Sequence, residues 1–182
     1  MLDYSKTFNE IYEMIFNDSI LSFNRTITDS MLRSAIEYKI TEIDKVINLT
    51  DEAIKDIYYQ MIWKSSGCEL LPYPINIIQF DNAMDVTPTT SIKGLQKVIN
   101  ELSGYRVVKP TGYVDYNTQK YIIRYTGSKK DIIDFSILYI DLRRSYYKTS
   151  AQKRNKYKLE LPERYNRLDK LEEIVNQYEK DK

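Results

Sequence analysis

The residue types available for acid–base chemistry in this sequence are Asp, Glu, Lys and Tyr, because its 182 residues include no His. Histidine is the most frequent general base and a common metal ligand, so its absence excludes Ser-His-Asp and Cys-His catalysis within this chain. The single cysteine, Cys68, excludes an internal disulfide and a cysteine zinc cluster. We therefore expect no metal and no cofactor.

Two carboxylates near the N-terminus have a spacing that could support acid–base chemistry. Glu10 and Glu13 lie three residues apart, which places them on one face of a helix. A neighbouring negative charge can raise the pKa of one of the two carboxyl groups. The alternative is a solvated polar face beside the apolar stripe that runs from Tyr4 to Ile15.

A second cluster of interest is basic and lies in the C-terminal third of the chain. Tyrosines interrupt it, and basic residues with interleaved aromatics can bind a nucleic-acid backbone. A solvated helix end and a surface for an acidic protein partner are the other interpretations. Acidic residues of the last helix, such as Asp169 and Glu172, could supply that complementarity between copies of the chain. The cluster comprises Arg143, Arg144, Tyr146, Tyr147, Lys148, Lys153, Arg154, Lys156, Tyr157 and Lys158.

Helical periodicity dominates the segments that would position these residues. Apolar residues recur at three- and four-residue steps, as on the buried face of a helix. N-cap side chains are available at Thr28 and Thr50. Residues 105–108 form a short extended stretch, and residues 149–161 form a polar linker. The predicted helices cover residues 4–16, 30–47, 51–63, 75–85, 91–102, 117–125, 129–148 and 162–180.

Length and composition limit the class of protein. A chain of 182 residues suits one domain, and a hydrophobic fraction of 42% is enough to build a core. The formal net charge of +1 gives no bulk attraction to nucleic acid or to an anionic membrane. We see no signal-peptide hydrophobic region and no apolar run long enough to span a bilayer. We therefore expect no membrane partner, and nucleic acid is not a favoured partner.

Five motifs occur in an order typical of one enzyme family. The helix Leu49–Trp63 opens with Leu-Thr and an acidic pair and ends with a Trp. Leu71-Pro72 is followed by Gln-Phe-Asp-Asn-Ala-Met-Asp at residues 79–85. Residues 112–118 form a Gly-to-Thr turn, and residues 143–147 read Arg-Arg-Ser-Tyr-Tyr. Together these motifs resemble glycoside hydrolase family 108, the phage-type N-acetylmuramidases, in which the turn belongs to a small peptidoglycan-binding subdomain.

The resemblance implies an all-α, lysozyme-like helical domain over residues 1–182. It also implies a small peptidoglycan-binding-type helical insert at residues 104–127. The C-terminal helix at residues 162–180 is predicted from its apolar spacing alone. Two of the candidate substrate-binding residues named below have a structural alternative. Trp63 could be a core residue, and Asp81 could brace a neighbouring element. The candidate substrate-binding residues are Trp63, Asp81, Asp85 and Thr87.

The catalytic element of the family is missing from this sequence. The family carries its acid in a Glu-Gly-Gly element after the first helix, whereas residues 16–20 here read Phe-Asn-Asp-Ser-Ile. Glycoside cleavage requires a carboxylic acid of raised pKa beside the leaving oxygen. By position, Asp18 is the nearest substitute, and Glu13 is the alternative. A solvated turn residue is the ordinary interpretation of Asp18.

We therefore predict a structural component of a larger assembly, a phage virion tail or neck, built on a muramidase-like scaffold with a degenerate active site. Its partners would be other virion proteins, copies of itself and, as a further candidate, peptidoglycan. It would reside in the virion or, before assembly, in the host cytoplasm. A divergent active N-acetylmuramidase and a non-catalytic peptidoglycan-binding module are the alternatives. Tyrosine is enriched at protein interfaces, and a partner is expected to cover Val175 and Tyr178 because the family resemblance stops near Leu171. The predicted interface residues are Arg143, Arg144, Tyr146, Tyr147, Val175 and Tyr178.

Overall fold

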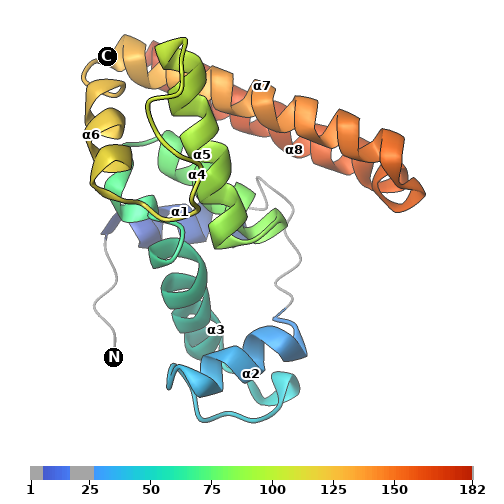
Figure 1. Cartoon of the computed structure of the whole chain (residues 1–182). Helices are drawn as coiled ribbons and strands as arrows, with labels where there is room; N and C mark the ends of the chain where they lie inside the picture. The colour runs from blue at the N-terminus through green and yellow to red at the C-terminus, as the bar shows by residue number, and fades with distance from the viewer. Residues whose placement is uncertain (1–5, 17–26, 182) are drawn as a thin grey trace. The chain divides into compact units, whose positions relative to one another are not determined.

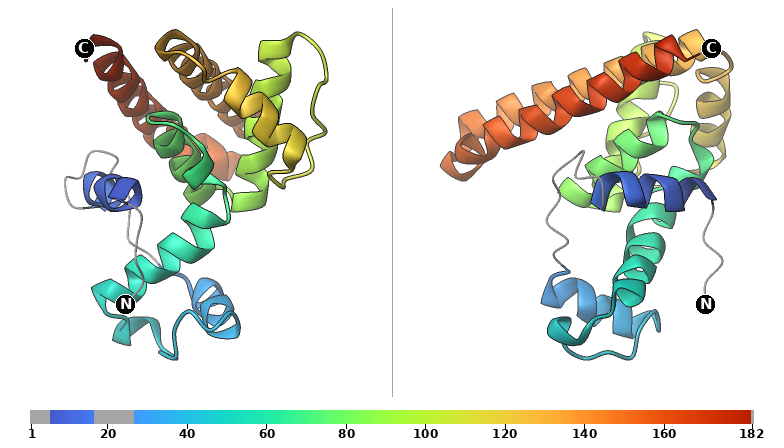
Figure 2. Two further views of the ribbon diagram at one scale, coloured as in Figure 1. Left: turned by 90° about the vertical axis from the view of Figure 1, so that its left-hand side faces the viewer. Right: turned by 180° about the vertical axis from the view of Figure 1, so that it is seen from behind.

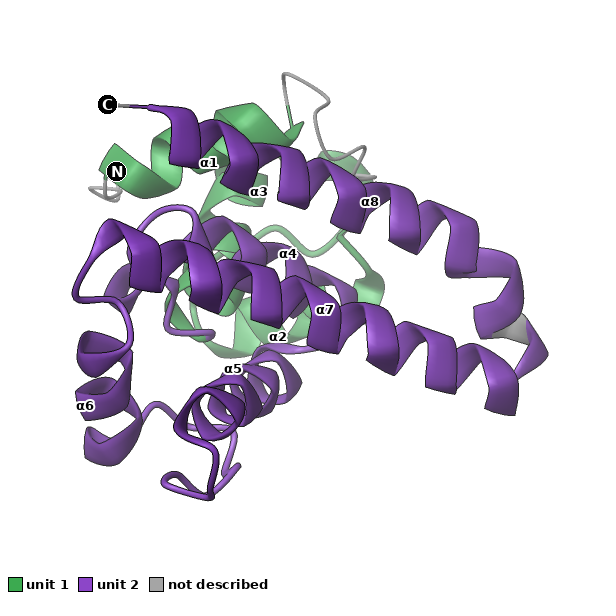
Figure 3. Cartoon of the chain, turned by 90° about the horizontal axis from the view of Figure 1, so that it is seen from above, with its two compact units in different colours: residues 1–65 green, residues 66–182 purple. Residues whose placement is uncertain are grey.

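The computed structural model describes residues 6–16 and 27–181. Within these residues every regular element is helical, which confirms the predicted all-α class (Figure 1). The chain divides into two compact units, residues 1–65 and residues 66–182 (Figure 3). The expected single domain over residues 1–182 stays a prediction.

The first unit has an aromatic core. The Phe8 ring of α1 lies 4.8 Å from the Tyr59 ring and 5.5 Å from the Trp63 ring, centroid to centroid. Thr28 and Thr50 cap α2 and α3, as predicted, by accepting hydrogen bonds from backbone N–H groups three residues later. The elements of this unit are α1 (Lys6–Phe16), α2 (Asp29–Glu37), η1 (Val46–Asn48), α3 (Asp51–Tyr58) and η2 (Tyr59–Lys64), the last being π-helical.

The predicted helix over residues 30–47 is wrong in its second half. α2 ends at Glu37, and Lys39 has a φ of 57°, which lies in the left-handed region and cannot continue a helix. The Ile40 N–H then donates to the Ala35 carbonyl at 2.8 Å and closes the helix end. Ile47, expected on a buried face, is 90% exposed. The prediction failed because the apolar spacing continues past Glu37, and such spacing carries no information about the backbone conformation at Lys39.

The second unit is dominated by a long helical hairpin. α7 and α8 run antiparallel and side by side along their length (Figures 1 and 2), with α4 and α5 packed against α7. At the other end of the hairpin from its turn, the Lys129 Nζ of α7 donates to the Glu179 carbonyl of α8 at 2.9 Å. The elements are η3 (Cys68–Leu70), α4 (Ile75–Asp85), α5 (Pro88–Ser103), α6 (Tyr116–Arg124), α7 (Lys129–Lys153) and α8 (Asn155–Lys180).

The predicted polar linker over residues 149–161 is also wrong. α7 continues to Lys153, the backbone is extended only at Arg154, and α8 begins at Asn155. Pro162 therefore lies inside α8 rather than at its start. Proline removes one backbone hydrogen bond, and packing of α8 along α7 supports the helix across that position.

The segment predicted as a small insert, residues 104–127, is held by side-chain amides of α5. Asn100 bonds the backbone at Val107 and Val108, so the extended stretch there is paired with a side chain and forms no strand. Gln96 accepts from the Gly112 N–H at 3.0 Å and donates to the Tyr113 carbonyl at 2.9 Å. Gly112 has a φ of 83°, a left-handed conformation that favours glycine. The Gly-to-Thr motif is thus a turn clamped by Gln96.

Candidate functional site

The most densely charged interior of the second unit lies between α4, α7 and α8. α4 carries Asp81 and Asp85 four residues apart, and therefore on one face. Asp81 is completely buried. Burying a carboxylate is costly unless cations and hydrogen-bond donors replace its water, so the neighbours of Asp81 decide its state.

Two arginines enclose the Asp81 carboxylate. Arg143 Nη2 of α7 lies 2.5 Å from Oδ2, and Arg167 Nη2 of α8 lies 2.6 Å from Oδ1. Burial acts to raise the pKa of the Asp81 carboxyl, but attraction to Arg167 and Arg143 outweighs it and holds the pKa below its usual value. Asp81 is therefore an ionised brace that joins three helices.

Asp85 extends this ion network toward the surface of the unit. Tyr147 Oη donates to Asp85 Oδ2 at 2.9 Å, and Arg164 Nη1 lies 2.6 Å from the same oxygen. Tyr147 Oη also accepts from Arg143 Nη2 at 2.8 Å, so this phenol links the two carboxylates. The Arg164 guanidinium lies 4.8 Å from the centroid of the Tyr147 ring, within cation–π range. We call Asp81, Asp85, Arg143, Tyr147, Arg164 and Arg167 the acid–arginine cluster.

The protonation states of the cluster suit a permanent structural element. Burial acts to lower the pKa of the Arg143 guanidinium, but Asp81 outweighs it and the pKa is raised. Burial raises the pKa of the Tyr147 phenol, so its O–H remains a donor near neutral pH. Asp81, Arg143 and Tyr147 therefore hold their protons and charges rather than exchanging them.

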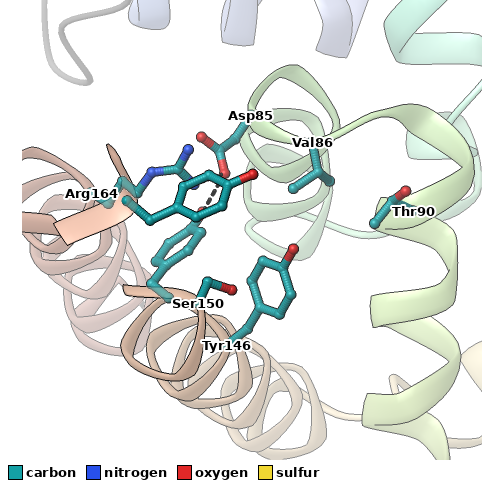
Figure 4. Close-up of a pocket in the computed structure, with 8 residues that line it drawn as sticks. Asp85, Val86, Thr90, Tyr146, Ser150 and Arg164 are labelled. Atoms are coloured by element: carbon teal, nitrogen blue, oxygen red, sulfur yellow. Dashed lines mark hydrogen bonds and ion pairs between the residues drawn. The ribbon is translucent and has the colours of Figure 1, made fainter. Parts of the chain in front are cut away.

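A cavity of about 250 Å³ opens beside the outer half of the cluster (Figure 4). Tyrosine rings, hydroxyl groups, a carboxylate and a guanidinium around one small space could hold a polar ring such as a sugar by stacking and hydrogen bonds. Asp85 already accepts from Tyr147 and Arg164, so the cavity offers binding groups but no free acid. The lining residues are Asp85, Val86, Thr90, Tyr146, Tyr147, Ser150, Tyr157 and Arg164.

The two candidate catalytic residues lie elsewhere in the sequence. Asp18 falls outside the described residues. Glu13 is on α1 of the first unit, with 51% of its side chain exposed and its Oε1 3.7 Å from the Lys55 Nζ. Glu13 is therefore a half-exposed surface carboxylate paired with a lysine, and not an enclosed acid.

The candidate substrate-binding residues occupy three different environments. Trp63 is 1% exposed in the aromatic core of the first unit, so its indole offers no open face for a sugar. Thr87 caps α5 by accepting from the Thr90 N–H at 3.2 Å, and it does not line the cavity. Asp81 is sealed between its arginines, which is the bracing contact considered from the sequence. Among these four candidates Asp85 alone lines the cavity, and its role in substrate binding stays a prediction.

Sequence reasoning did not assign the residues that α8 contributes to the cavity: Arg164 was not considered, and Tyr157 was considered only as part of the basic cluster. Tyr157 and Arg164 lie seven residues apart, and both face the Asp85 side of the hairpin. Seven residues is two helical turns, so the spacing was the available signal. It went unused because Tyr157 falls in the segment predicted as a linker.

The predicted interface residues are divided by the structure. Arg143, Tyr147 and Val175 are buried within the chain, so they are corrected from interface residues to interior ones. Arg144 forms ion pairs with Asp169 and Glu172 across the hairpin. Tyr146 is 52% exposed and lines the cavity. Tyr178 packs edge-on against Tyr73, with ring centroids 5.8 Å apart.

The described residues hold no group of three or more His, Cys, Asp or Glu side chains arranged to bind a metal ion. The helices in residues 6–16 and 27–181 include none that is both long and apolar enough to cross a membrane. The one thiol, Cys68, is buried, and burial raises its pKa far above the usual value, so it is not a nucleophile near neutral pH.

Comparison with known proteins gives a family match over part of the chain and a similar fold over nearly all of it. The glycosyl hydrolase 108 family model matches residues 23–86, the segment that contains Asp81 and Asp85. The solved structure of Brucella abortus SagA is similar, with a TM-score of 0.70, 18% sequence identity, and coverage of 98% of both chains. A search of curated proteins found no match. These findings confirm the resemblance to the family and the lysozyme-like, all-α fold class.

Proposed function

We propose that the chain, which resembles glycosyl hydrolase 108 over residues 23–86, is a muramidase-like protein that does not hydrolyse peptidoglycan. We propose that it acts instead as a structural component of a larger assembly. A phage tail or neck is the setting we favour, because muramidase-like domains are common in phage tails. The two parts of this proposal, lost hydrolysis and assembly, are testable separately.

The proposal of lost hydrolysis rests on the pKa of Asp81, on the hydrogen-bond partners of Asp85 and on the missing Glu-Gly-Gly element. A glycosidase acid needs a raised pKa, whereas the pKa of Asp81, inside the family match, is lowered by two arginines. Its neighbour Asp85 is occupied by Tyr147 and Arg164. The sequence also lacks the Glu-Gly-Gly element that carries the acid in the family.

A peptidoglycan turbidity assay, with a zymogram, tests the loss of hydrolysis. The purified chain should give no clearing, and Asp18→Asn and Glu13→Gln should be indistinguishable from it. Clearing that disappears in either variant would identify that residue as the acid and overturn the proposal. Clearing unaffected by both variants would also overturn it, and would place the acid elsewhere.

Exposed apolar side chains support the assembly part of the proposal. Tyr105, Tyr113, Tyr116 and Ile123 are each more than 70% exposed, and all lie within a 19-residue segment. Exposed aromatic side chains gathered in one segment are typical of a contact surface. An interface that covers this segment would remove them from water.

Light scattering and chemical crosslinking test this surface. The double variant Tyr116→Ser with Ile123→Ser should reduce self-association of the chain or its crosslinking to another protein of the assembly. Ile47→Ser is the control, because Ile47 is also exposed, at 90%, and belongs to the other unit. An unchanged particle size in the double variant, or an equal loss in the control, would contradict an interface at this segment.

The cavity beside Asp85 favours a second candidate function, glycan binding without cleavage. Its tyrosine rings and hydrogen-bonding groups match the chemistry of a sugar. Purified peptidoglycan should retain the chain in a sedimentation assay, and Tyr157→Ala should reduce the retained fraction. Tyr105→Ala, an exposed tyrosine outside the cavity, is the control. Equal retention of all three proteins would exclude the cavity as the binding site.

A further inference from the structure

A second and larger cavity shares Val86, Thr90 and Tyr146 with the first cavity in its lining. It has a volume of about 440 Å³ and is enclosed by α5, α7 and the segment that carries Pro110, all within the second unit. Val86, Pro110, Leu142 and the rings of Tyr139 and Tyr146 provide apolar walls. This volume is within the range of small-molecule binding sites.

The charges around this cavity have one sign. None of its thirteen lining residues is acidic, and three are basic: Lys93, Lys97 and Arg143. Lys93 and Lys97 lie four residues apart and so share one face of α5, where both are exposed. Within the described residues, neither ammonium group has a carboxylate within ion-pair distance. The Arg143 charge is balanced by Asp81, so the two lysines supply the uncompensated charge.

Arg143 contributes a second observation at the inner wall. It is 4% exposed, and its Nε–H has no hydrogen-bond acceptor among the described residues. Buried donors are usually satisfied, so an unsatisfied one on a cavity-lining residue is consistent with a missing acceptor. The cavity beside Asp85 differs in this respect, because a carboxylate lines it and would repel an anion.

We propose that the cavity between α5 and α7 binds a small amphipathic carboxylate. Its alkyl body would lie against Leu142, Pro110 and Tyr146. Its carboxylate would face the ammonium groups of Lys93 and Lys97, with the Arg143 Nε–H as a further donor. A bare inorganic anion would leave the apolar walls unused, and a neutral hydrocarbon would leave the lysines unused. The ligand therefore needs both parts.

Three ligands with the same alkyl chain test the charge requirement on the unmodified protein. Octanoate, octanol and octylammonium are titrated in turn, and binding is followed by isothermal calorimetry and by amide chemical shifts. Octanoate should bind most tightly, octanol more weakly and octylammonium weakest, with shifts concentrated on α5 and α7. Equal affinity for octanoate and octanol, no binding of octanoate, or shifts centred elsewhere would overturn the proposal.

Variants separate the two halves of the site. Lys93→Gln with Lys97→Gln should weaken octanoate binding about tenfold, since each exposed ion pair contributes modestly, and should leave octanol binding unchanged. Lys109→Gln with Lys120→Gln is the control, because these exposed lysines do not line the cavity. An equal loss in this control, or no loss in the first pair, would contradict recognition by Lys93 and Lys97.

A cavity-filling variant tests the apolar half. A Cβ at Gly94 would lie 3.4 Å from Asn82 Nδ2 and 3.7 Å from the Tyr139 ring, which are acceptable contacts. The longer side chain of Gly94→Leu should then occupy the cavity and abolish binding of both octanoate and octanol. Thermal unfolding shows whether this variant is folded, and Gly94→Ala, which leaves most of the space open, should retain binding. Retained octanoate binding by a folded Gly94→Leu would place the ligand elsewhere.

Discussion

The two units each contain an acid–base ion pair that was a candidate for function, and burial distinguishes them. In the first unit, Glu13 is half exposed and its carboxylate lies 3.7 Å from the Lys55 ammonium. In the second unit, Asp81 is completely buried and its carboxylate lies 2.5 and 2.6 Å from Arg143 and Arg167. The same pairing of charges is therefore incidental in one place and structural in the other.

The physical cause of the difference is the surrounding solvent. Water and salt screen the exposed pair, which is worth about 0–1 kcal/mol. At Asp81 no water competes, and three helices must each deliver a charged side chain to one point. Removing Asp81 would leave Arg143 buried without its ion-pair partner. A carboxylate that the sequence suggests as a functional acid can thus be a structural brace, and the burial of the side chain distinguishes the brace from an incidental surface pair.

The largest effect is expected from Asp81→Asn. The variant removes the ion-pair partner of buried Arg143 and leaves Arg167 only its 3.8 Å contact with Asp85, which should cost about 3–5 kcal/mol of unfolding free energy. Chemical denaturation at pH 7 measures it. Asp169→Asn, which breaks only the exposed pair with Arg144, is the matched control and should cost about 0–1 kcal/mol. Equal losses in the two variants would remove the contrast between buried and exposed pairs.

Acid should erase much of the Asp81 contribution. The pKa of Asp81 is lower in the folded protein than in the unfolded chain. Its contribution to stability is therefore complete above the unfolded pKa of about 3.9 and is lost as pH falls through the folded value. The difference in unfolding free energy between the unmodified chain and Asp81→Asn should shrink below about pH 4. A difference that stays constant down to pH 2 would contradict an ionised brace.

Tyr147→Phe is expected to have an intermediate effect. The change keeps the ring under Arg164 but removes the hydroxyl that bridges Arg143 and Asp85. Hydrogen bonds to charged groups are worth about 1.5–3 kcal/mol each, so we expect a loss of unfolding free energy in that range. Thermal unfolding measures the loss as a lower melting temperature. Tyr146→Phe, whose exposed ring lies next along the chain, should change little. A neutral Tyr147→Phe would mean that the bridge adds no stability.

The smallest effect is expected at the exposed pair. Glu13→Gln should lower the unfolding free energy by no more than about 1 kcal/mol, and less at high salt, because exposed pairs are screened. Denaturation at low and high ionic strength measures it. A loss comparable to that of Asp81→Asn would show that Glu13 has a structural role that its exposure does not reveal.

Much of the local structure was predictable. The caps at Thr28 and Thr50, and the bounds of α4, were read from residue types and spacing, because these features depend on side chains within one helical turn. The errors at Lys39 and at residues 149–161 have opposite causes. A backbone turn ended one helix early, and packing of α8 along α7 kept another helical through a polar segment.

The sequence by itself determined the helical class, the exclusion of histidine-based catalysis and the missing Glu-Gly-Gly element, since these require only composition and near-neighbour spacing. The tertiary structure alone decided that Asp81 meets Arg143 and Arg167, which are 62 and 86 residues away along the chain. It also decided that Tyr157 and Arg164 share a cavity with Asp85. Burial and long-range pairing arise when helices pack, and no local pattern specifies which distant charge will arrive.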